Sequence, residues 1–310
     1  MKFSELVELR DRLTTVYNTS AISSGVDVLD TDLCHIKNSV TDLALKDEVS
    51  DLTTDLHRIY TTLKLNQDRY TALLDHVNQR ISSDAAKFFT DNYKLELKYN
   101  AVENIRKIRV MSLRDDTREE ILSRIQLHTS WKYPALEIGC RDGEWTKYMV
   151  AADPLYIVDH HREFTESAVS NFNEIYQRRI RVYLTEEHDL STLPQGQMAF
   201  VFCWNLLNYA SFDTVKEYLK SVKTILRPGG TFLFSYNDGD RPGCAGMAES
   251  FFMSYIPKSM LIPLCESLGY RVVQDCAREM TVSWLEIQLP GELKTVKAHQ
   301  VMGEIKHINN

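Results

Sequence analysis

A sustained heptad pattern of apolar residues in the first third of the chain constrains its fold most strongly. Residues 26–82 contain no proline, and from Leu45 to Val77 the apolar positions alternate at spacings of four and three. Roughly five heptads follow one another, more than the three or four that indicate a coiled coil. So narrow an apolar stripe must be buried against a partner helix. The seam positions are Leu45, Val49, Leu52, Leu56, Ile59, Leu63, Asn66, Tyr70, Leu73 and Val77.

We expect this seam to self-associate through residues 26–82, as a dimer or trimer, or to dock onto a larger assembly. A neighbouring helix of the same chain is the alternative partner, although the sequence offers no second stripe of equal quality. Asn66 would fix the register or the number of helices. An earlier stripe that ends at Leu43 is out of phase with the seam, which predicts an irregularity or a turn near Lys46. Residues 1–82 are therefore expected to be a helical coiled-coil region for oligomerisation or attachment.

The next segment, residues 83–115, is expected to be a helical connector. Ser83 or Asp84 could cap a short helix that contains Phe88. A small basic cluster in this segment is best explained as a solvated helix face, with an anion or substrate contact as the alternative. The cluster consists of Arg106, Lys107 and Arg109.

Composition excludes several classes of protein. Hydrophobic residues at 44% and charged residues at 25% are typical of a globular chain. No run approaches the ~18 apolar residues that span a membrane, and residues 1–20 lack the apolar core of a secretory signal. A net charge of −7 disfavours a protein that coats nucleic acid. The six cysteines form no CxxC pair and have no histidines at zinc-ligand spacing, so we expect reduced thiols, no metal and a cytoplasmic location.

From residue 116 the pattern changes to short apolar strands that alternate with helices. This alternation predicts an α/β domain over residues 116–310, with a doubly wound, mostly parallel sheet of seven strands covered on both faces. Asp116 is expected to cap the first helix. The strands are expected at residues 135–138, 155–158, 181–184, 199–203, 231–236, 270–273 and 281–288, and later helices at 144–151, 165–176, 212–225 and 260–268.

The loop after the first of these strands carries the strongest sign of a ligand. A buried strand runs into Gly139 and Gly143 and then into a helix, at the edge of the sheet where open α/β proteins bind ligands. Gly139 allows a tight turn, and Gly143 allows the close approach of a ligand or of a packed helix. Asp159 ends the next strand about 20 residues later, as expected for an acid that accepts from ribose hydroxyl groups.

Together these motifs resemble class I S-adenosylmethionine-dependent methyltransferases. Residues 137–143 are similar to the family's first motif, E/D-x-G-x-G-x-G, and Asp159 matches its ribose-binding acid. Residues 188–194 resemble the loop whose acid, here Asp189, meets the adenine amino group; residues 200–205 and 226–230 resemble the fourth strand and the turn before the fifth. The resemblance implies S-adenosylmethionine as cofactor. The binding residues it implies are Glu137, Gly139, Cys140, Arg141, Gly143, Asp159, His160, Asp189, Leu190 and Asn205.

Two positions depart from the family pattern. Arg141 stands where the middle glycine is expected, and Ala199 where the fourth strand often carries an acid. Arg141 could cover the methionine carboxylate of the cofactor or narrow the site. A nicotinamide cofactor is the alternative, and it is disfavoured because Gly139 and Gly143 do not provide the G-x-G-x-x-G spacing.

Methyl transfer from a sulfonium is an in-line displacement, so the protein mainly aligns the acceptor and removes its proton. We expect Asn205 and Asp238 to be the catalytic residues, with turn capping as the alternative role of Asp238. Residues 239–255 could be a lid over the site or only a long connection.

Two functions follow from the sequence. The first is methyl transfer to an unidentified acceptor by an enzyme that the coiled coil oligomerises or tethers. The alternative is a catalytically degenerate structural or interaction protein that keeps the methyltransferase fold. The arrangement also resembles methyltransferase-like proteins of tailed bacteriophages, so the alternative includes a virion-associated particle component.

Overall fold

The structure is a computed structural model in which the chain divides into two units, Met1–Lys87 and Phe88–Asn310. The residues it describes are 2–19, 43–99, 113–186 and 188–293. Within these ranges no helix is long and apolar enough to cross a membrane.

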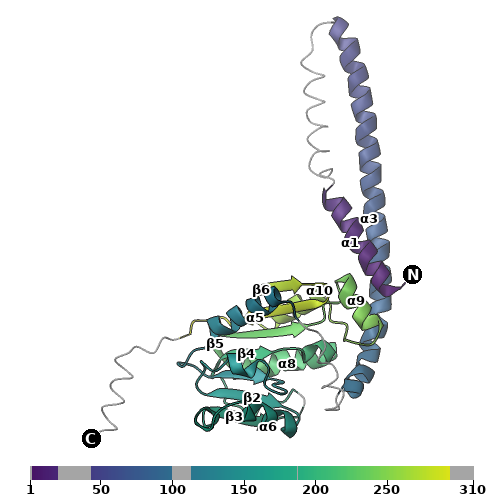
Figure 1. Cartoon of the computed structure of the whole chain (residues 1–310). Coiled ribbons are helices and arrows are strands. Elements are labelled where there is room, and N and C mark those ends of the chain that lie inside the picture. The colour runs from purple at the N-terminus through teal and green to yellow at the C-terminus, as the bar shows by residue number, and fades with distance from the viewer. Residues whose placement is uncertain (1, 20–42, 100–112, 187, 294–310) are drawn as a thin grey trace. The chain divides into compact units, whose positions relative to one another are not determined.

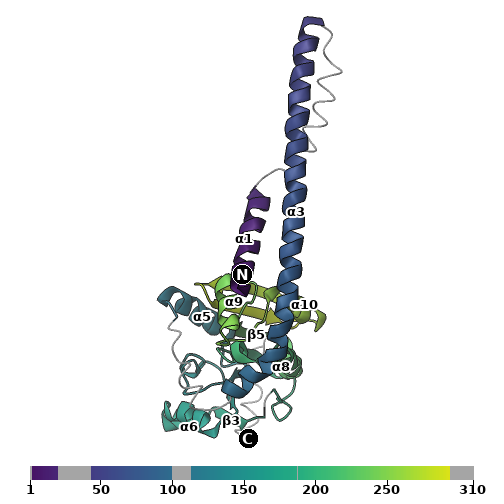
Figure 2. The same cartoon turned by 90° about the vertical axis from the view of Figure 1, so that its right-hand side faces the viewer.

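The first unit is helical. It contains α1 (Phe3–Thr19) and most of α3 (Leu43–Tyr99), a single 57-residue helix that Figures 1 and 2 show as one long rod. α3 begins at Leu43 and is helical at Lys46, while residues 20–42, which carry most of the earlier stripe, lie outside the described residues. The irregularity or turn near Lys46 therefore stays a prediction. The short helix predicted to be capped at Ser83 or Asp84 is wrong, since both residues lie inside α3. The basic cluster Arg106, Lys107 and Arg109 lies outside the described residues.

The second unit contains a seven-stranded sheet in the order β3-β2-β1-β4-β5-β7-β6. Figure 1 shows β3 and β6 at its two ends. The first five strands pair in parallel and β7 pairs antiparallel with β5 and β6, which confirms the predicted doubly wound, mostly parallel sheet. The strands are β1 (Ala135–Ile138), β2 (Leu155–Asp159), β3 (Ile180–Leu184), β4 (Met198–Cys203), β5 (Leu226–Tyr236), β6 (Arg271–Arg278) and β7 (Val282–Gln288).

The helices of this unit follow the prediction less closely than the strands. The segment expected to be a helix over residues 144–151 forms only a 3-10 turn, and residues 165–176 are split between two helices because Asn173 caps the second one through the Tyr176 amide. The first helix is capped at Arg114 without a side-chain bond, so the predicted Asp116 cap is wrong. The elements are α5 (Asp115–His128), η1 (Thr146–Tyr148), α6 (Arg162–Ser170), α7 (Glu174–Gln177), η2 (Leu207–Tyr209), α8 (Phe212–Ile225), α9 (Pro242–Glu249) and α10 (Lys258–Ser267).

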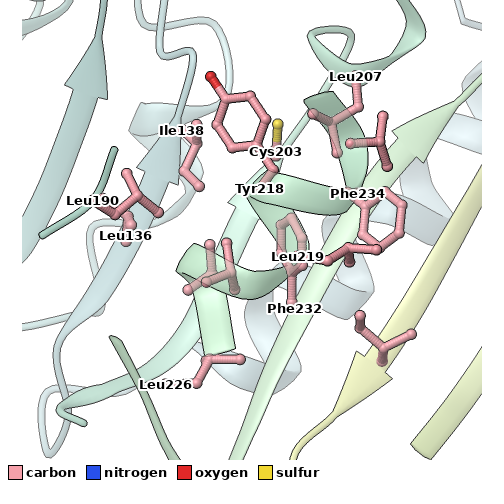
Figure 3. Close-up of a cluster of buried hydrophobic side chains, with 14 of the residues drawn as sticks. Leu136, Ile138, Leu190, Cys203, Leu207, Tyr218, Leu219, Leu226, Phe232 and Phe234 are labelled. Carbon is pink, nitrogen blue, oxygen red and sulfur yellow. The ribbon is translucent and has the colours of Figure 1, made fainter. Parts of the chain in front are cut away.

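Apolar cores cover both faces of the sheet, because successive residues of a strand point to opposite faces. Along β4, Val201 joins the core under α8, whereas Phe200 and Phe202 join the core under α5. Figure 3 shows the first of these cores, with Phe232 and Phe234 of β5 packed near Leu219 of α8. Each fully buried phenylalanine contributes about 1.5–3 kcal/mol of transfer free energy, so these cores fix the strand ends that carry the site.

Candidate functional site

The candidate site lies at the carboxyl ends of β1, β2 and β4. β1 pairs with β2 on one side and with β4 on the other, so the strand order reverses at β1: β2 and β3 follow it on one side, and β4 and β5 on the other. Ligands of open α/β sheets bind at such a switch point. The pairing places the Gly139 turn beside Asp159 at the end of β2 and beside the loop that follows Cys203.

The two glycines of the β1 loop serve different needs. Gly139 has φ +72° and donates its N–H to the Val158 carbonyl at 2.8 Å, so the turn itself requires glycine. Gly143 has φ +79°, and a Cβ there would lie 3.0 Å from the Cα of Ala168 in α6. Of the two alternatives for Gly143, the structure therefore favours the close approach of a packed helix.

Arg141 joins the loops that follow β1 and β4. Its φ of +48° is the left-handed conformation that a glycine would adopt with less strain. Its backbone N–H donates to Asp159 Oδ2 at 3.1 Å, and its Nη2 donates to the Asn205 carbonyl at 2.7 Å. Burial of the guanidinium lowers the pKa of Arg141, although the nearby Tyr209 and Asp159 oppose this shift. The side chain therefore runs between the two loops and narrows the site, and its contact with the cofactor carboxylate stays a prediction.

Asp159 is a buried acceptor at the end of β2. Its Oδ2 accepts from the Arg141 amide and its Oδ1 accepts from the His161 amide at 3.0 Å. An ionised carboxylate has about four lone-pair sites, so each oxygen retains the capacity for one more donor. Asp159 can thus hold the loop and still accept from a ligand hydroxyl group.

Glu137 is buried at the start of the motif, behind the loop. Its Oε2 accepts from Thr146 Oγ1 at 2.5 Å, and Thr146 is the buried first residue of η1. Burial raises the pKa of Glu137 to about 8, despite the opposing bond from Thr146, so the side chain is mostly neutral at pH 7. Burial also raises the pKa of the Cys140 thiol, which makes it a poor nucleophile.

His160, Leu190 and Asp189, the acid predicted to meet the adenine, are bound to the chain in different ways. His160 Nδ1 lies 3.0 Å from the Thr185 carbonyl and its Nε2 lies 3.2 Å from the Tyr218 hydroxyl, so His160 joins β3 to α8. Asp189 is exposed and accepts from the Ser191 amide at 2.9 Å, which lowers the pKa of Asp189. Leu190 is buried in the core (Figure 3).

Asn205 follows β4 in a left-handed conformation, with φ +57°. Asparagine tolerates this region better than most residues, so the backbone alone explains its presence. Its N–H donates to Ser235 Oγ at 2.6 Å and its carbonyl accepts from Arg141. The structure thus brings Arg141, Asp159 and Asn205 together through direct hydrogen bonds.

Asp238 occupies a structural position. Its buried Oδ1 accepts from the Asp240 amide at 3.1 Å and from the Lys258 amide at 2.9 Å, at the first residue of α10. Burial raises the pKa of Asp238. The hydrogen bonds that the structure gives Asp238 join it to this turn and to α10, as in the capping alternative, and its role as a base stays a prediction.

Residues 239–255 form an anchored connection that includes α9. Asn237 Nδ2 donates to the carbonyls of Cys244 at 2.9 Å and Ser254 at 2.8 Å. From the other side, Arg241 Nη1 donates to the Val282 carbonyl at 2.7 Å. These bonds, to the residue that follows β5 and to the first residue of β7, favour the connection over the lid.

Sequence reasoning missed three buried polar residues at this edge. Thr146 was predicted to lie in a helix, whereas its hydroxyl donates a hydrogen bond to Glu137. Ser235 and Asn208 were overlooked, although the Ser235 hydroxyl accepts from Asn205 and donates to Asn208 Oδ1 at 2.7 Å. The available signal was the serine near the end of an otherwise apolar and aromatic strand in Thr231–Tyr236.

Comparison with known proteins agrees with this geometry. Residues 135–230 match a family model described as a methyltransferase domain. This segment contains β1 to β4, the Gly139 turn, Asp159 and Asn205, so the match covers the elements that form the site. It supports S-adenosylmethionine as the cofactor. No curated protein matches the chain.

Solved structures with a similar fold include three methyltransferases. An S-adenosylmethionine-dependent methyltransferase from Aquifex aeolicus is 16% identical, covers 61% of this chain and 98% of its own, and has a TM-score of 0.47. A second, from Clostridium acetobutylicum, is 13% identical with coverages of 59% and 95% and a TM-score of 0.49. The N-methyltransferase NodS from Bradyrhizobium japonicum, in complex with S-adenosyl-L-homocysteine, is 16% identical with coverages of 64% and 97% and a TM-score of 0.47.

Proposed function

We propose that this chain transfers a methyl group from S-adenosylmethionine to an acceptor that is still to be identified. The observation that carries the proposal is the hydrogen-bonded group of Arg141, Asp159 and Asn205 at the switch point between β1 and β4. This group lies inside the segment that matches a methyltransferase domain.

The residues at this edge fit the chemical groups of the cofactor. Asp159 retains acceptor capacity for the two ribose hydroxyl groups, as argued above. The Arg141 guanidinium is half-buried, and its one side-chain bond among the described contacts is to a neutral carbonyl, so it can also pair with the carboxylate of the methionine part. The neutral Glu137 behind the loop adds little negative charge that would compete for Arg141.

The acceptor side of the site is simpler. S-adenosylmethionine supplies a methyl group that its sulfonium already activates, so alignment is the main task of the protein. Asn205 carries no side chain that titrates, and its proposed role is therefore to orient the acceptor by hydrogen bonding. Asp238 is proposed as a base only for an acceptor that must lose a proton before transfer.

Calorimetry on the full chain tests the proposal. We expect S-adenosylmethionine and S-adenosyl-L-homocysteine to bind, and Asp159→Ala to weaken both by tenfold or more, because a hydrogen-bonded carboxylate is lost, at about 1.5–3 kcal/mol. The matched control is Asp153→Ala, which removes a partly exposed carboxylate that pairs with Arg179. If neither ligand binds wild-type protein at high micromolar concentration, the enzymatic function is refuted.

A specific observation supports the degenerate alternative. Both oxygens of Asp159 and the guanidinium of Arg141 already bond to the chain itself, so this edge is held together without a ligand. A structural or interaction protein needs no more than that. The same calorimetry separates the two functions, because this alternative predicts no heat from either ligand.

We also propose that α3 mediates self-association. On the described part of its seam, Ile59 is 53% exposed and Leu73 is 43% exposed in the single chain, whereas Val77 is already buried within the chain. A helix exposes a regular apolar seam at a cost in free energy unless another helix covers it. A second copy of the chain, as a dimer or trimer, would supply that helix, and a larger assembly, including a virion, is the alternative.

A further inference from the structure

We propose that Ser235 is a positioning residue that sets the grip of Arg141 on the carboxylate of the methyl donor. Ser235 lies in β5 and bonds directly to Asn205, but it has no hydrogen bond to Arg141 among the described contacts. The proposal rests on the proposed function, since it concerns the same cofactor site.

The Ser235 hydroxyl is the centre of a short, buried hydrogen-bond chain. Its oxygen accepts from the Asn205 N–H at 2.6 Å, and its hydrogen is donated to Asn208 Oδ1 at 2.7 Å. Asn208 is fixed in turn, because its carbonyl accepts from the Ser254 amide at 2.8 Å. Ser235 and Asn208 are both buried, so water does not readily replace these bonds.

These hydrogen bonds determine where the Asn205 carbonyl points. Asn205 is left-handed, a conformation that asparagine adopts more readily than most residues with a Cβ, and its neighbours hold it there. The bond from its N–H to Ser235 is the restraint on its amino side. Its carbonyl then receives Arg141 Nη2 at 2.7 Å. Without the Ser235 hydroxyl, Asn205 is free to relax and Arg141 loses its anchor.

The loss of this anchor should affect some ligands and not others. Arg141 would face the methionine carboxylate, whereas Asp159 would face the ribose. A change at Ser235 should therefore weaken ligands that carry the carboxylate and spare ligands that lack it. A merely structural defect would weaken both kinds of ligand alike.

The test uses calorimetry on the full chain with two ligands, S-adenosyl-L-homocysteine and 5′-methylthioadenosine, which lacks the amino-acid part. We expect Ser235→Ala to weaken the first roughly five- to tenfold, as for the loss of one buried hydrogen bond, and to leave the second within about twofold. Ser254→Ala is the matched control, because it keeps the backbone amide that bonds to Asn208 and removes only a buried hydroxyl with no hydrogen-bond partner among the described residues. It should change neither ligand.

Two further variants make the test decisive. Asn208→Ala removes the acceptor of the same hydroxyl, and it should give the same selective loss if Ser235→Ala does not fold. In an Arg141→Ala background, Ser235→Ala should cause no additional loss, because Ser235 is proposed to act through Arg141. An equal loss for both ligands, or an additive loss in the double variant, overturns the positioning role. If wild-type protein binds neither ligand, the proposed function itself fails.

Discussion

Arg141 is left-handed at a position where glycine would carry no strain, and this can be measured as stability. Arg141→Gly and Arg141→Ala both remove the 2.7 Å bond to Asn205, so that loss cancels when the two variants are compared. Alanine keeps the left-handed cost of about 1–2 kcal/mol, and glycine avoids it. Glycine in turn loses about 0.5–1 kcal/mol more chain entropy on folding. Arg141→Gly should therefore be more stable than Arg141→Ala by about 0.5–1 kcal/mol.

Urea unfolding of the two variants provides the measurement, because the midpoint and slope give the free energy of unfolding of each. In a thermal melt, the same difference should appear as a midpoint about 1–4 °C higher for glycine in a domain of this size. Gly196→Ala serves as a reference, since Gly196 also has a positive φ, of 65°, and a Cβ there would meet nothing within 4 Å. If Arg141→Ala equals or exceeds Arg141→Gly in stability, the strain assigned to Arg141 is refuted.

Three other predictions concern charge and assembly. The raised pKa of Glu137, about 8, means that the native state binds more protons than the unfolded state between about pH 4.5 and 8, so stability should fall as the pH rises through this range. Glu137→Gln should flatten this decline in urea unfolding measurements, and an unchanged decline would contradict the prediction. Glu286 is fully buried and accepts two 2.7 Å hydrogen bonds from Arg124. Glu286→Gln should therefore lower the free energy of unfolding by about 3–5 kcal/mol, and a loss below about 1 kcal/mol would count against this prediction. Leu73→Lys on the α3 seam should lower the mass measured by light scattering below that of wild-type protein, whereas Ala72→Lys beside the seam should not. If Leu73→Lys has the same mass as wild-type protein, the self-association proposal is refuted.

The strands were predictable because their signal is local. Each buried strand is a short apolar run with turn residues at its ends, and β1 was placed with the bounds it has in the structure. The α8 helix was also placed correctly, from Phe212 to Ile225, because Ser211 caps it and its apolar residues recur at helical spacing. The long α3 helix likewise follows from its periodicity, although its continuity past Ser83 does not.

The details of the site were not predictable because they depend on partners distant in sequence. The segment after Gly143 has helix-forming residues, yet the bond from Thr146 to the buried Glu137 accompanies a 3-10 turn there instead. No local sequence pattern predicts that Ser235 forms a hydrogen bond with Asn205, thirty positions earlier in the chain. The sequence identified the residue types at the edge of the sheet, and the packing of β1, β4 and β5 decided which of them touch.

The left-handed backbone of Arg141 and Asn205 gives a way to distinguish the two proposed functions. Arg141 and Asn205 are both left-handed residues with a Cβ, and one guanidinium-to-carbonyl bond joins them. Strain of this kind persists where the surroundings enforce it, and it is frequent where a protein binds ligands. If the chain only keeps a fold, replacing Arg141 by glycine relieves strain and has no further effect. If the chain holds a methyl donor, the same replacement relieves strain and also removes the preference for S-adenosyl-L-homocysteine over 5′-methylthioadenosine. Stability and ligand preference measured together on Arg141→Gly therefore distinguish an enzyme from a degenerate fold.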